Sequence, residues 1–145
     1  MYKIGILIPT TSVKRNWKGL SETTLYNIFL RSFTETYCSQ YKYIIYLIID
    51  DDDAIFGRTK TQDEITKIVS KFKNISVQFV SSKNIAKGWV TKMWNKAFKI
   101  AYDDKCDYFY QCGDDILLQS KKWVTNSINK LKKQTYDYKQ KIEHN

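Results

Sequence analysis

The sequence is poor in the residues that build metal cages, and it lacks a long apolar run. It contains one histidine, His144, and three cysteines, Cys38, Cys106 and Cys112, which do not have the spacing of a metal site. The longest clean apolar run, Tyr43 to Ile49, is far too short to cross a bilayer. The cysteine count therefore argues against a metal site built on thiolates, and the short apolar runs exclude an integral membrane protein.

The cysteine usage also bears on the compartment. An odd number of cysteines and the lack of a charged and then apolar leader before the first predicted strand lead us to expect a reducing, cytoplasmic setting. Attachment to the surface of a membrane stays open. If the gene is viral, a source that the bias towards Lys, Ile, Asn and Tyr would fit, the expected compartment is the host cytoplasm.

The charge is strongly positive. Twenty-four Lys and Arg against fifteen acids give a net charge of +9, which attracts nucleic acid, an anionic membrane surface or a phosphorylated small molecule. No stretch is dense enough in basic residues to resemble a nucleic-acid-binding arm, and the lysines are spread along predicted helical faces. We interpret most of the charge as solvated surface and do not expect nucleic acid as the partner.

Apolar runs and amphipathic segments alternate along the chain. Strands are predicted at 2–8, 43–49, 75–80 and 107–112, and helices at about 21–36, 62–73, 90–101 and 121–133. This order predicts an α/β fold, a Rossmann-like three-layer sandwich with a mainly parallel sheet, strand order 3-2-1-4 and helices on both faces. It corresponds to one domain over residues 1–134, followed by a polar, frayed tail over 135–145.

Two helix starts are predicted from capping residues. Ser21 has the chemistry of an N-cap for the first helix. Thr61 and Glu64 have the spacing of a capping box, so the second helix is expected to begin at Gln62.

Two clusters of carboxylates follow predicted strands. Asp50 to Asp53 follow the second strand, and Gly113-Asp114-Asp115 follow the fourth. With strand order 3-2-1-4, these clusters and the loop Pro9-Thr10-Thr11 would border one crevice at the carboxyl ends of the strands. The plainer alternative is that Asp114 and Asp115 form a turn and cap the next segment.

Two carboxylates in one cleft favour a bound cation. At a separation of about 4 Å and an effective dielectric near 20 they repel by roughly 4 kcal/mol, and a divalent cation relieves this repulsion. Oxygen ligands favour Mn²⁺ or Mg²⁺ over zinc.

The order of these features resembles the nucleotide-sugar-binding half of GT-A-fold glycosyltransferases, most closely those of family 2. The features are Pro9-Thr10 after the first strand, Asp50-Asp51 after the second, the segment Gly88 to Ala97, and Cys106-Asp107-Tyr108 followed by Gly113-Asp114-Asp115. The resemblance covers roughly residues 2 to 118. Each motif is short, so the resemblance rests on their order and spacing together.

The resemblance implies positions for the nucleoside. Pro9, Thr10 and Thr11 would line the base, and Asp50 or Asp51 would hold the nucleoside.

It also implies positions for the phosphates and the metal. Lys92 and Asn95, in the third predicted helix, would lie near the base and phosphates; the alternative is that both are solvated helix surface. Asp115, with Asp114 beside it, would hold Mn²⁺ or Mg²⁺ on the diphosphate. Gly113 stands where the first acid of the family's "DxD" motif is usual.

The function implied by the resemblance is that of a metal-dependent glycosyltransferase, or the donor-binding domain of one. It would transfer a sugar from a nucleoside-diphosphate sugar to a hydroxyl of a glycan, protein or lipid acceptor. Family members supply a carboxylate general base beyond the metal motif, whereas the acids that follow Asp115 in this sequence are Asp137 and Glu143. The catalytic base is therefore not identified.

Two alternatives remain. One is a non-catalytic basic module that binds a sugar nucleotide or nucleic acid. The other is a nucleotidyltransferase, which usually has a glycine-rich phosphate loop after the first strand; the segment Pro9 to Ser12 contains no glycine.

Overall fold

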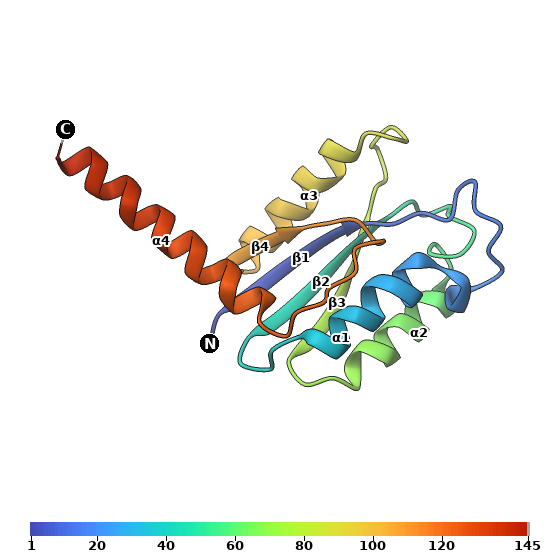
Figure 1. Cartoon of the computed structure of the whole chain (residues 1–145). Coiled ribbons are helices and arrows are strands. Elements are labelled where there is room, and N and C mark those ends of the chain that lie inside the picture. Colours follow the sequence, from blue (N-terminus) through green and yellow to red (C-terminus); the bar gives the residue numbers. More distant parts are fainter. Residues whose placement is uncertain (145) are drawn as a thin grey trace.

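The computed structural model describes residues 1–144 and shows four strands that alternate with helices (Figure 1). The strands are β1 (Lys3–Pro9), β2 (Lys42–Ile49), β3 (Ile75–Ser81) and β4 (Tyr108–Gln111). The helices are the 3₁₀ turn η1 (Leu20–Glu22), the π-helical segment η2 (Leu25–Leu30), α1 (Arg31–Thr36), α2 (Thr59–Ser70), α3 (Val90–Asp103) and α4 (Trp123–Glu143).

The four strands form one parallel sheet in the order β3-β2-β1-β4. In the register of the sheet, Ile6 lies opposite Ile45 on one side and Tyr110 on the other. The predicted α/β class, the parallel sheet and the strand order 3-2-1-4 are confirmed. The chain proceeds from β1 through β2 to β3 on one side and then crosses back to β4, so the order reverses at β1.

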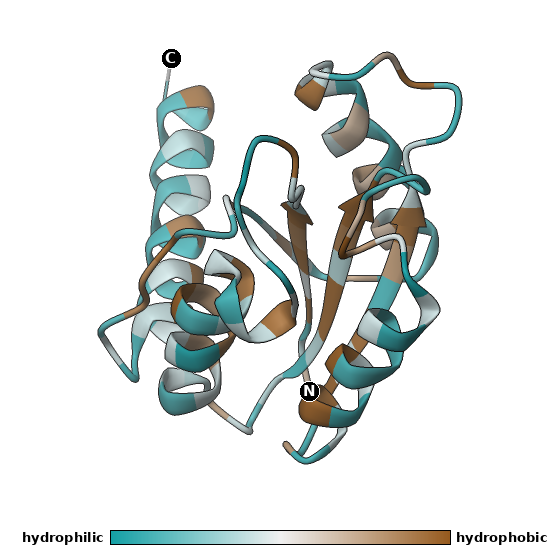
Figure 2. Cartoon of the chain, turned by 90° about the vertical axis from the view of Figure 1, so that its right-hand side faces the viewer, coloured by the Kyte–Doolittle hydropathy of each residue, from teal (hydrophilic) through white to brown (hydrophobic). Residues whose placement is uncertain are grey.

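Helices cover both faces of the sheet. The side chains of Ile4, Ile6 and Ile8 join an apolar cluster with residues of η2, α1, α2 and the start of α4. Leu7 points the other way and packs in a second cluster with α3. Figure 2 shows the hydrophobic strands between helices with largely hydrophilic outer surfaces. The molecule is thus the Rossmann-like three-layer sandwich that the alternation predicts.

The first helix begins later than predicted, and its N-cap is a different residue. Ser21 lies within the short η1 turn, and the predicted 21–36 helix is divided into η1, η2 and α1. The hydroxyl of Thr23 donates to the carbonyl of Leu20 and accepts a bond from the N–H of Tyr26 at 3.2 Å. Thr23 therefore fills the capping role, because a completely buried hydroxyl must find partners in the backbone.

The second helix begins three residues earlier than predicted, and the capping box is not formed. α2 starts at Thr59, its N-cap is Arg58, and no side chain caps that end. Thr61 is instead a buried residue inside the first turn. The amide of Gln62 donates to the carbonyl of Phe56 at 2.9 Å, which fastens the helix to the preceding loop.

The last helix is longer than the predicted 121–133. α4 continues to Glu143 through most of the segment expected to be a frayed polar tail; Asn145 lies outside the described residues. Its first turns pack on the sheet, and the remainder projects away from the other elements (Figure 1). None of the helices within residues 1–144 combines the length and the apolar character needed to span a bilayer.

Gly57 supplies a test of the loop that follows β2. A β-carbon at this position would lie 2.5 Å from the carbonyl oxygen of Asp51 and 2.7 Å from that of Asp53. Because both atoms belong to the backbone, the loop must open to relieve the clash, and Gly57→Ala is expected to lower the free energy of unfolding by about 1–3 kcal/mol. Urea denaturation measures the change.

Gly19→Ala is the matched control. Nothing lies within 4 Å of its added β-carbon, and the backbone at Gly19 is extended. Its effect is expected to stay within about 0.5 kcal/mol. Equal unfolding midpoints for the two variants would contradict the close loop packing.

Candidate functional site

A pocket of about 460 Å³ lies where the carboxyl ends of β1, β2 and β4 meet the amino end of α3. In Figure 1 this is the end of the sheet opposite to the one from which α4 projects. The lining residues come from these strand ends, from the connector before α3 and from α3 itself: Pro9, Thr10, Thr11, Val13, Ile48, Asp50, Lys87, Gly88, Val90, Met93, Trp94, Gly113 and Asp114. The pocket thus occupies the switch point of the sheet, where parallel α/β proteins bind ligands.

The floor of the pocket carries oxygen atoms from three strand ends. The hydroxyl of Thr10 donates to a carboxylate oxygen of Asp114 at 2.6 Å and so joins the loop after β1 to the loop after β4. On the other side, the hydroxyl of Ser82 donates to the carboxylate of Asp50. Each carboxylate has one oxygen in such a bond, so both retain acceptor capacity.

Part of the pocket lining is apolar. Ile48 from β2 and Val13 from the first loop form it together with Val90, Met93 and Trp94 from the first turns of α3. These side chains offer a surface against which a flat ring can stack or pack, whereas the polar floor offers hydrogen bonds and charge.

Lys87 is the cationic group at the rim. Its ammonium lies 3.1 Å from a carboxylate oxygen of Asp52, and both side chains are largely exposed. The hydrogen bond and the charge of Asp52 raise the pKa of Lys87 above its usual value. The exposed pair contributes little to stability, so Lys87 is free to exchange this partner for an anionic ligand.

Asp53 holds the two loops of the pocket together. One of its carboxylate oxygens accepts bonds from the N–H of Ser12 at 2.8 Å and the hydroxyl of Thr11 at 3.3 Å. The other accepts from the hydroxyl of Ser12 at 2.6 Å and from the N–H groups of Ile55 at 3.0 Å and Phe56 at 2.9 Å. Asp53 is only 5% exposed, so it is an organising residue rather than a ligand.

The ionisation of Asp53 follows from these contacts. Burial raises its pKa, but the hydrogen bonds from Ser12, Ile55 and Phe56 outweigh burial and hold the pKa below its ordinary value. A buried carboxylate with this many donors is stabilised as the anion.

The residues predicted from the sequence divide into two groups. Five of them come together in the pocket: Pro9, Thr10, Thr11, Asp50 and Asp114.

The other four are exposed and do not line the pocket: Asp51, Lys92, Asn95 and Asp115. The ammonium of Lys92 lies 3.9 Å from the ring centre of Trp89, in a cation–π contact on the outside of α3. The carboxylate of Asp115 turns back over Gly113, where an added β-carbon would lie 2.8 Å from it.

The acidic side chains of the pocket could share in holding a divalent cation, but they do not form a cage for one. Within residues 1–144, no group of three or more His, Cys, Asp or Glu side chains is arranged to hold a metal ion. Two pocket acids, Asp50 and Asp114, come from different strand ends. These residues fit a cation that is shared between one or two carboxylates and the phosphates of a ligand, which is how Mg²⁺ is commonly bound, and they do not fit an all-protein cage.

Sequence reasoning missed the apolar part of the pocket lining. Val90, Met93 and Trp94 have the spacing of a core-facing helical stripe, and the pattern alone cannot tell a stripe that packs on a sheet from one that borders a pocket. The glycine at Gly88, two residues before α3, was a usable signal, because glycine is the residue that favours the left-handed backbone found there, with φ of +84°.

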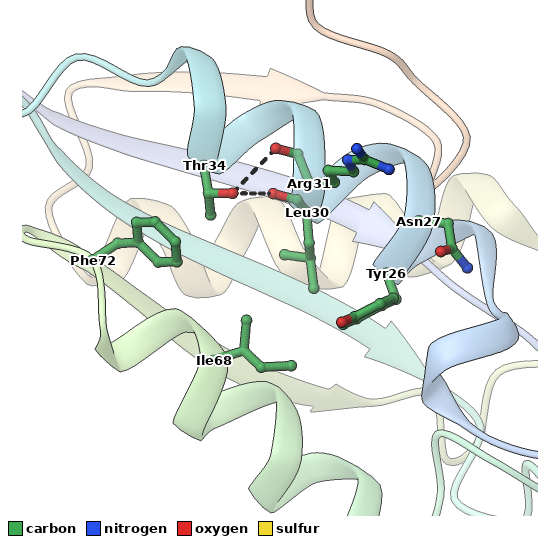
Figure 3. Close-up of a pocket in the computed structure, with 7 residues that line it drawn as sticks. All are labelled: Tyr26, Asn27, Leu30, Arg31, Thr34, Ile68 and Phe72. Atoms are coloured by element: carbon green, nitrogen blue, oxygen red, sulfur yellow. Dashed lines mark hydrogen bonds between the residues drawn. The ribbon is translucent and has the colours of Figure 1, made fainter.

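A second cavity, of about 340 Å³, lies between the η2–α1 segment and α2 (Figure 3). Its lining residues are Tyr26, Asn27, Leu30, Arg31, Thr34, Ile68 and Phe72. The hydroxyl of Thr34 is already bonded to the carbonyls of Leu30 and Arg31. None of the predicted site residues borders this cavity, so the candidate site is the pocket at the strand ends.

Comparison of the chain with protein-family models, with curated protein sequences and with solved structures found no match in any of the three. The class that the fold itself defines is a Rossmann-like parallel α/β protein with a pocket at the switch point of its sheet.

Substitution of Asp53 tests the link between the loops. Both carboxylate oxygens of Asp53 accept bonds from backbone N–H groups. Asp53→Asn replaces one of these oxygens with an NH₂ group, which would then face a backbone N–H donor with a donor of its own. We expect a loss of about 2 kcal/mol in the free energy of unfolding at pH 7. The control is Asp51→Asn, which changes an exposed neighbour and is expected to cost less than about 0.5 kcal/mol.

The pH dependence gives an independent readout. Because the folded-state pKa of Asp53 is lowered, its contribution to stability is fully present above the unfolded-state value of 3.8 and is lost as pH falls through the folded-state pKa. The stability difference between the natural chain and Asp53→Asn should therefore shrink below about pH 3.8. A difference that stays constant down to pH 3 would contradict the role of the ionised carboxylate.

Proposed function

We propose that the pocket at the strand ends binds a nucleoside-diphosphate sugar and that the chain is a metal-dependent glycosyltransferase of the GT-A type or the donor-binding domain of one. The observation that supports this most directly is the convergence of Pro9, Thr10, Thr11, Asp50 and Asp114 from three separate strand ends on one pocket. The resemblance to family 2 glycosyltransferases implies nucleotide contacts for these same positions.

The chemistry of the pocket suits the parts of such a ligand. The apolar side chains of Val90, Met93 and Trp94 can pack against a base, while Asp50 can accept hydrogen bonds from the nucleoside. Lys87 offers a positive charge to the diphosphate. The volume of about 460 Å³ lies in the range of small-molecule sites.

Asp114 is the pocket carboxylate best suited to a shared cation. It lies beside the switch point and is held by Thr10 through one oxygen. Mn²⁺ or Mg²⁺, when bound there, would neutralise the leaving diphosphate of the donor. The residues of the chain would bind and orient the donor: Thr10 fixes Asp114, and Asp53 fixes the loop that bears Thr10.

Sugar transfer would require a general base in addition to the donor site. The acids that follow Asp115, namely Asp137 and Glu143, both belong to α4, which projects from the opposite end of the sheet (Figure 1). They are therefore not suited to activate an acceptor hydroxyl at the pocket, because a general base must lie within hydrogen-bond reach of the proton that it removes.

Calorimetric titration tests the donor site. The natural chain and Asp114→Asn are titrated with a panel of nucleoside-diphosphate sugars, with and without Mn²⁺. We expect metal-dependent binding of one nucleotide and a loss of at least about tenfold in affinity for the variant, because loss of a metal ligand commonly costs this much or more.

Asp63→Asn serves as the control, since Asp63 is an exposed acid of α2 and its replacement changes the charge by the same amount. Its affinity should equal that of the natural chain. Absence of binding to every nucleotide, or binding that needs neither Mn²⁺ nor Asp114, would remove the proposal.

Lys87→Gln tests the phosphate end of the site. The variant should bind a nucleoside diphosphate several-fold more weakly, by about 1 kcal/mol, and the free nucleoside unchanged, because only the diphosphate carries the charge that Lys87 meets. Lys83→Gln is the control in the same connector, since Lys83 is exposed and does not line the pocket. Equal losses for diphosphate and nucleoside would show that Lys87 acts on the fold rather than on phosphate.

A further inference from the structure

An apolar stripe runs along the whole of α4 on the face that packs against the sheet. Its positions are spaced alternately by four and three residues: Val124, Ile128, Leu131, Thr135, Tyr138 and Ile142. The first two are buried against β1 and β4. The stripe therefore runs the length of the helix with one polar position, Thr135, and the sheet covers only its beginning.

The later part of the stripe is open. Tyr138 is 65% exposed and Ile142 60%, whereas Leu131, at 49%, still borders the hollow that α4 forms with β1 and β4. Figure 1 shows this part of α4 projecting away from the other elements, and in Figure 2 hydrophobic colour recurs along α4 up to its far end. Near the start of the projecting part, Lys132 still contacts the body of the protein, since its ammonium lies 4.8 Å from the ring centre of Tyr2.

The charges beside the stripe are positive. At 100° per residue, Lys132 and Lys139 flank it on one side and Lys141 on the other, whereas the acids Asp137 and Glu143 lie further round the helix. Lysines beside an apolar stripe can extend their ammonium groups outwards while their methylene stems lie along the apolar surface.

These flanking charges distinguish two candidates for what covers the stripe, a second copy of α4 and an anionic membrane surface. If a second copy of α4 covered the stripe as a coiled coil, the lysines would stand at the positions that face the partner helix, with no flanking acid to pair with them. They would repel. An anionic surface can pair with the lysines on both sides of the stripe at once. Tyrosine is also a residue that favours the interface between lipid and water.

We propose that the projecting part of α4, residues 131–143, docks on an anionic membrane surface, with Tyr138 and Ile142 entering the headgroup region and the flanking lysines binding acidic lipid headgroups. The apolar contact and the charge contact supply two separate contributions to one attachment, as stable interfacial binding requires. This inference is independent of the proposed donor site.

The experiment is co-sedimentation of the full chain with vesicles of phosphatidylcholine alone or with added phosphatidylserine. The natural chain is expected to bind the anionic vesicles, to release as salt is raised, and to bind the neutral ones at least about tenfold more weakly. Failure to bind the anionic vesicles overturns the proposal.

Two variants with matched controls separate the contributions. Tyr138→Ser together with Ile142→Ser should reduce binding on the order of tenfold, whereas Tyr136→Ser, which removes an equally exposed tyrosine outside the stripe, should leave it unchanged. Lys139→Gln together with Lys141→Gln should also reduce binding on the order of tenfold. Lys60→Gln together with Lys67→Gln removes the same charge from α2 and should not.

Circular dichroism and the unfolding midpoint check the fold of the variants, which are expected to remain folded because all of these positions are exposed. Sedimentation velocity without vesicles measures whether the chain is a monomer or a dimer. A monomer supports the membrane surface as occupant. A dimer that the double variant Tyr138→Ser with Ile142→Ser dissociates assigns the stripe to a second copy of the chain and overturns the proposal. Equal vesicle binding by Tyr136→Ser and by that double variant overturns it as well.

Discussion

The buried carboxylate of Asp53 joins the loop after β1 to the loop after β2, and the geometry of the strand-end pocket depends on that link. Ser12 and Thr11 donate to it from one loop, and Ile55 and Phe56 donate from the other. The N–H of Thr10 still donates to the carbonyl of Ile48 in β2 at 3.0 Å, but the connection beyond Thr10 has left the ladder and needs other partners. A carboxylate with donors on both oxygens supplies such partners. The loop held in this way is the one that begins with Thr10.

From this link the arrangement of the pocket follows in steps. With its loop anchored, Thr10 donates to Asp114 across the point where the strand order reverses, and Asp50 is held from the far side by Ser82. Two acids from different strand ends thus line one pocket together with the apolar side chains at the start of α3. The same topology sends α4 away from the opposite end of the sheet, so the proposed donor pocket and the proposed membrane-docking part of α4 lie at opposite ends of the strands (Figure 1).

The fold was more predictable than the site. The parallel sheet and its order follow from alternating apolar runs and helices, because handedness leaves few arrangements for such a chain. Helix ends were less predictable, since Thr61 has the spacing of a capping box yet is buried in the helix, and Thr23 rather than Ser21 caps the first helix. In the run Asp50 to Asp53, sequence alone gives four equivalent acids, and only the path of the chain shows that Asp53 is the buried one. For Lys92, predicted either to lie near the base and phosphates or to be solvated helix surface, the exposed position over Trp89 fits the second, because helix phase decides which side chains face the pocket.

The central claim, that the switch-point pocket binds a nucleoside diphosphate together with a divalent cation, is tested most directly by nuclear magnetic resonance with Mn²⁺ as a paramagnetic probe. In the presence of a nucleoside diphosphate, substoichiometric Mn²⁺ should broaden the amide signals of Thr10, Gly113 and Asp114 first and leave those of α2 and α4 sharp. Without the nucleotide the broadening should be weaker, because the two carboxylates alone hold the cation poorly. Broadening centred on another surface, or equal broadening with and without nucleotide, would contradict the account.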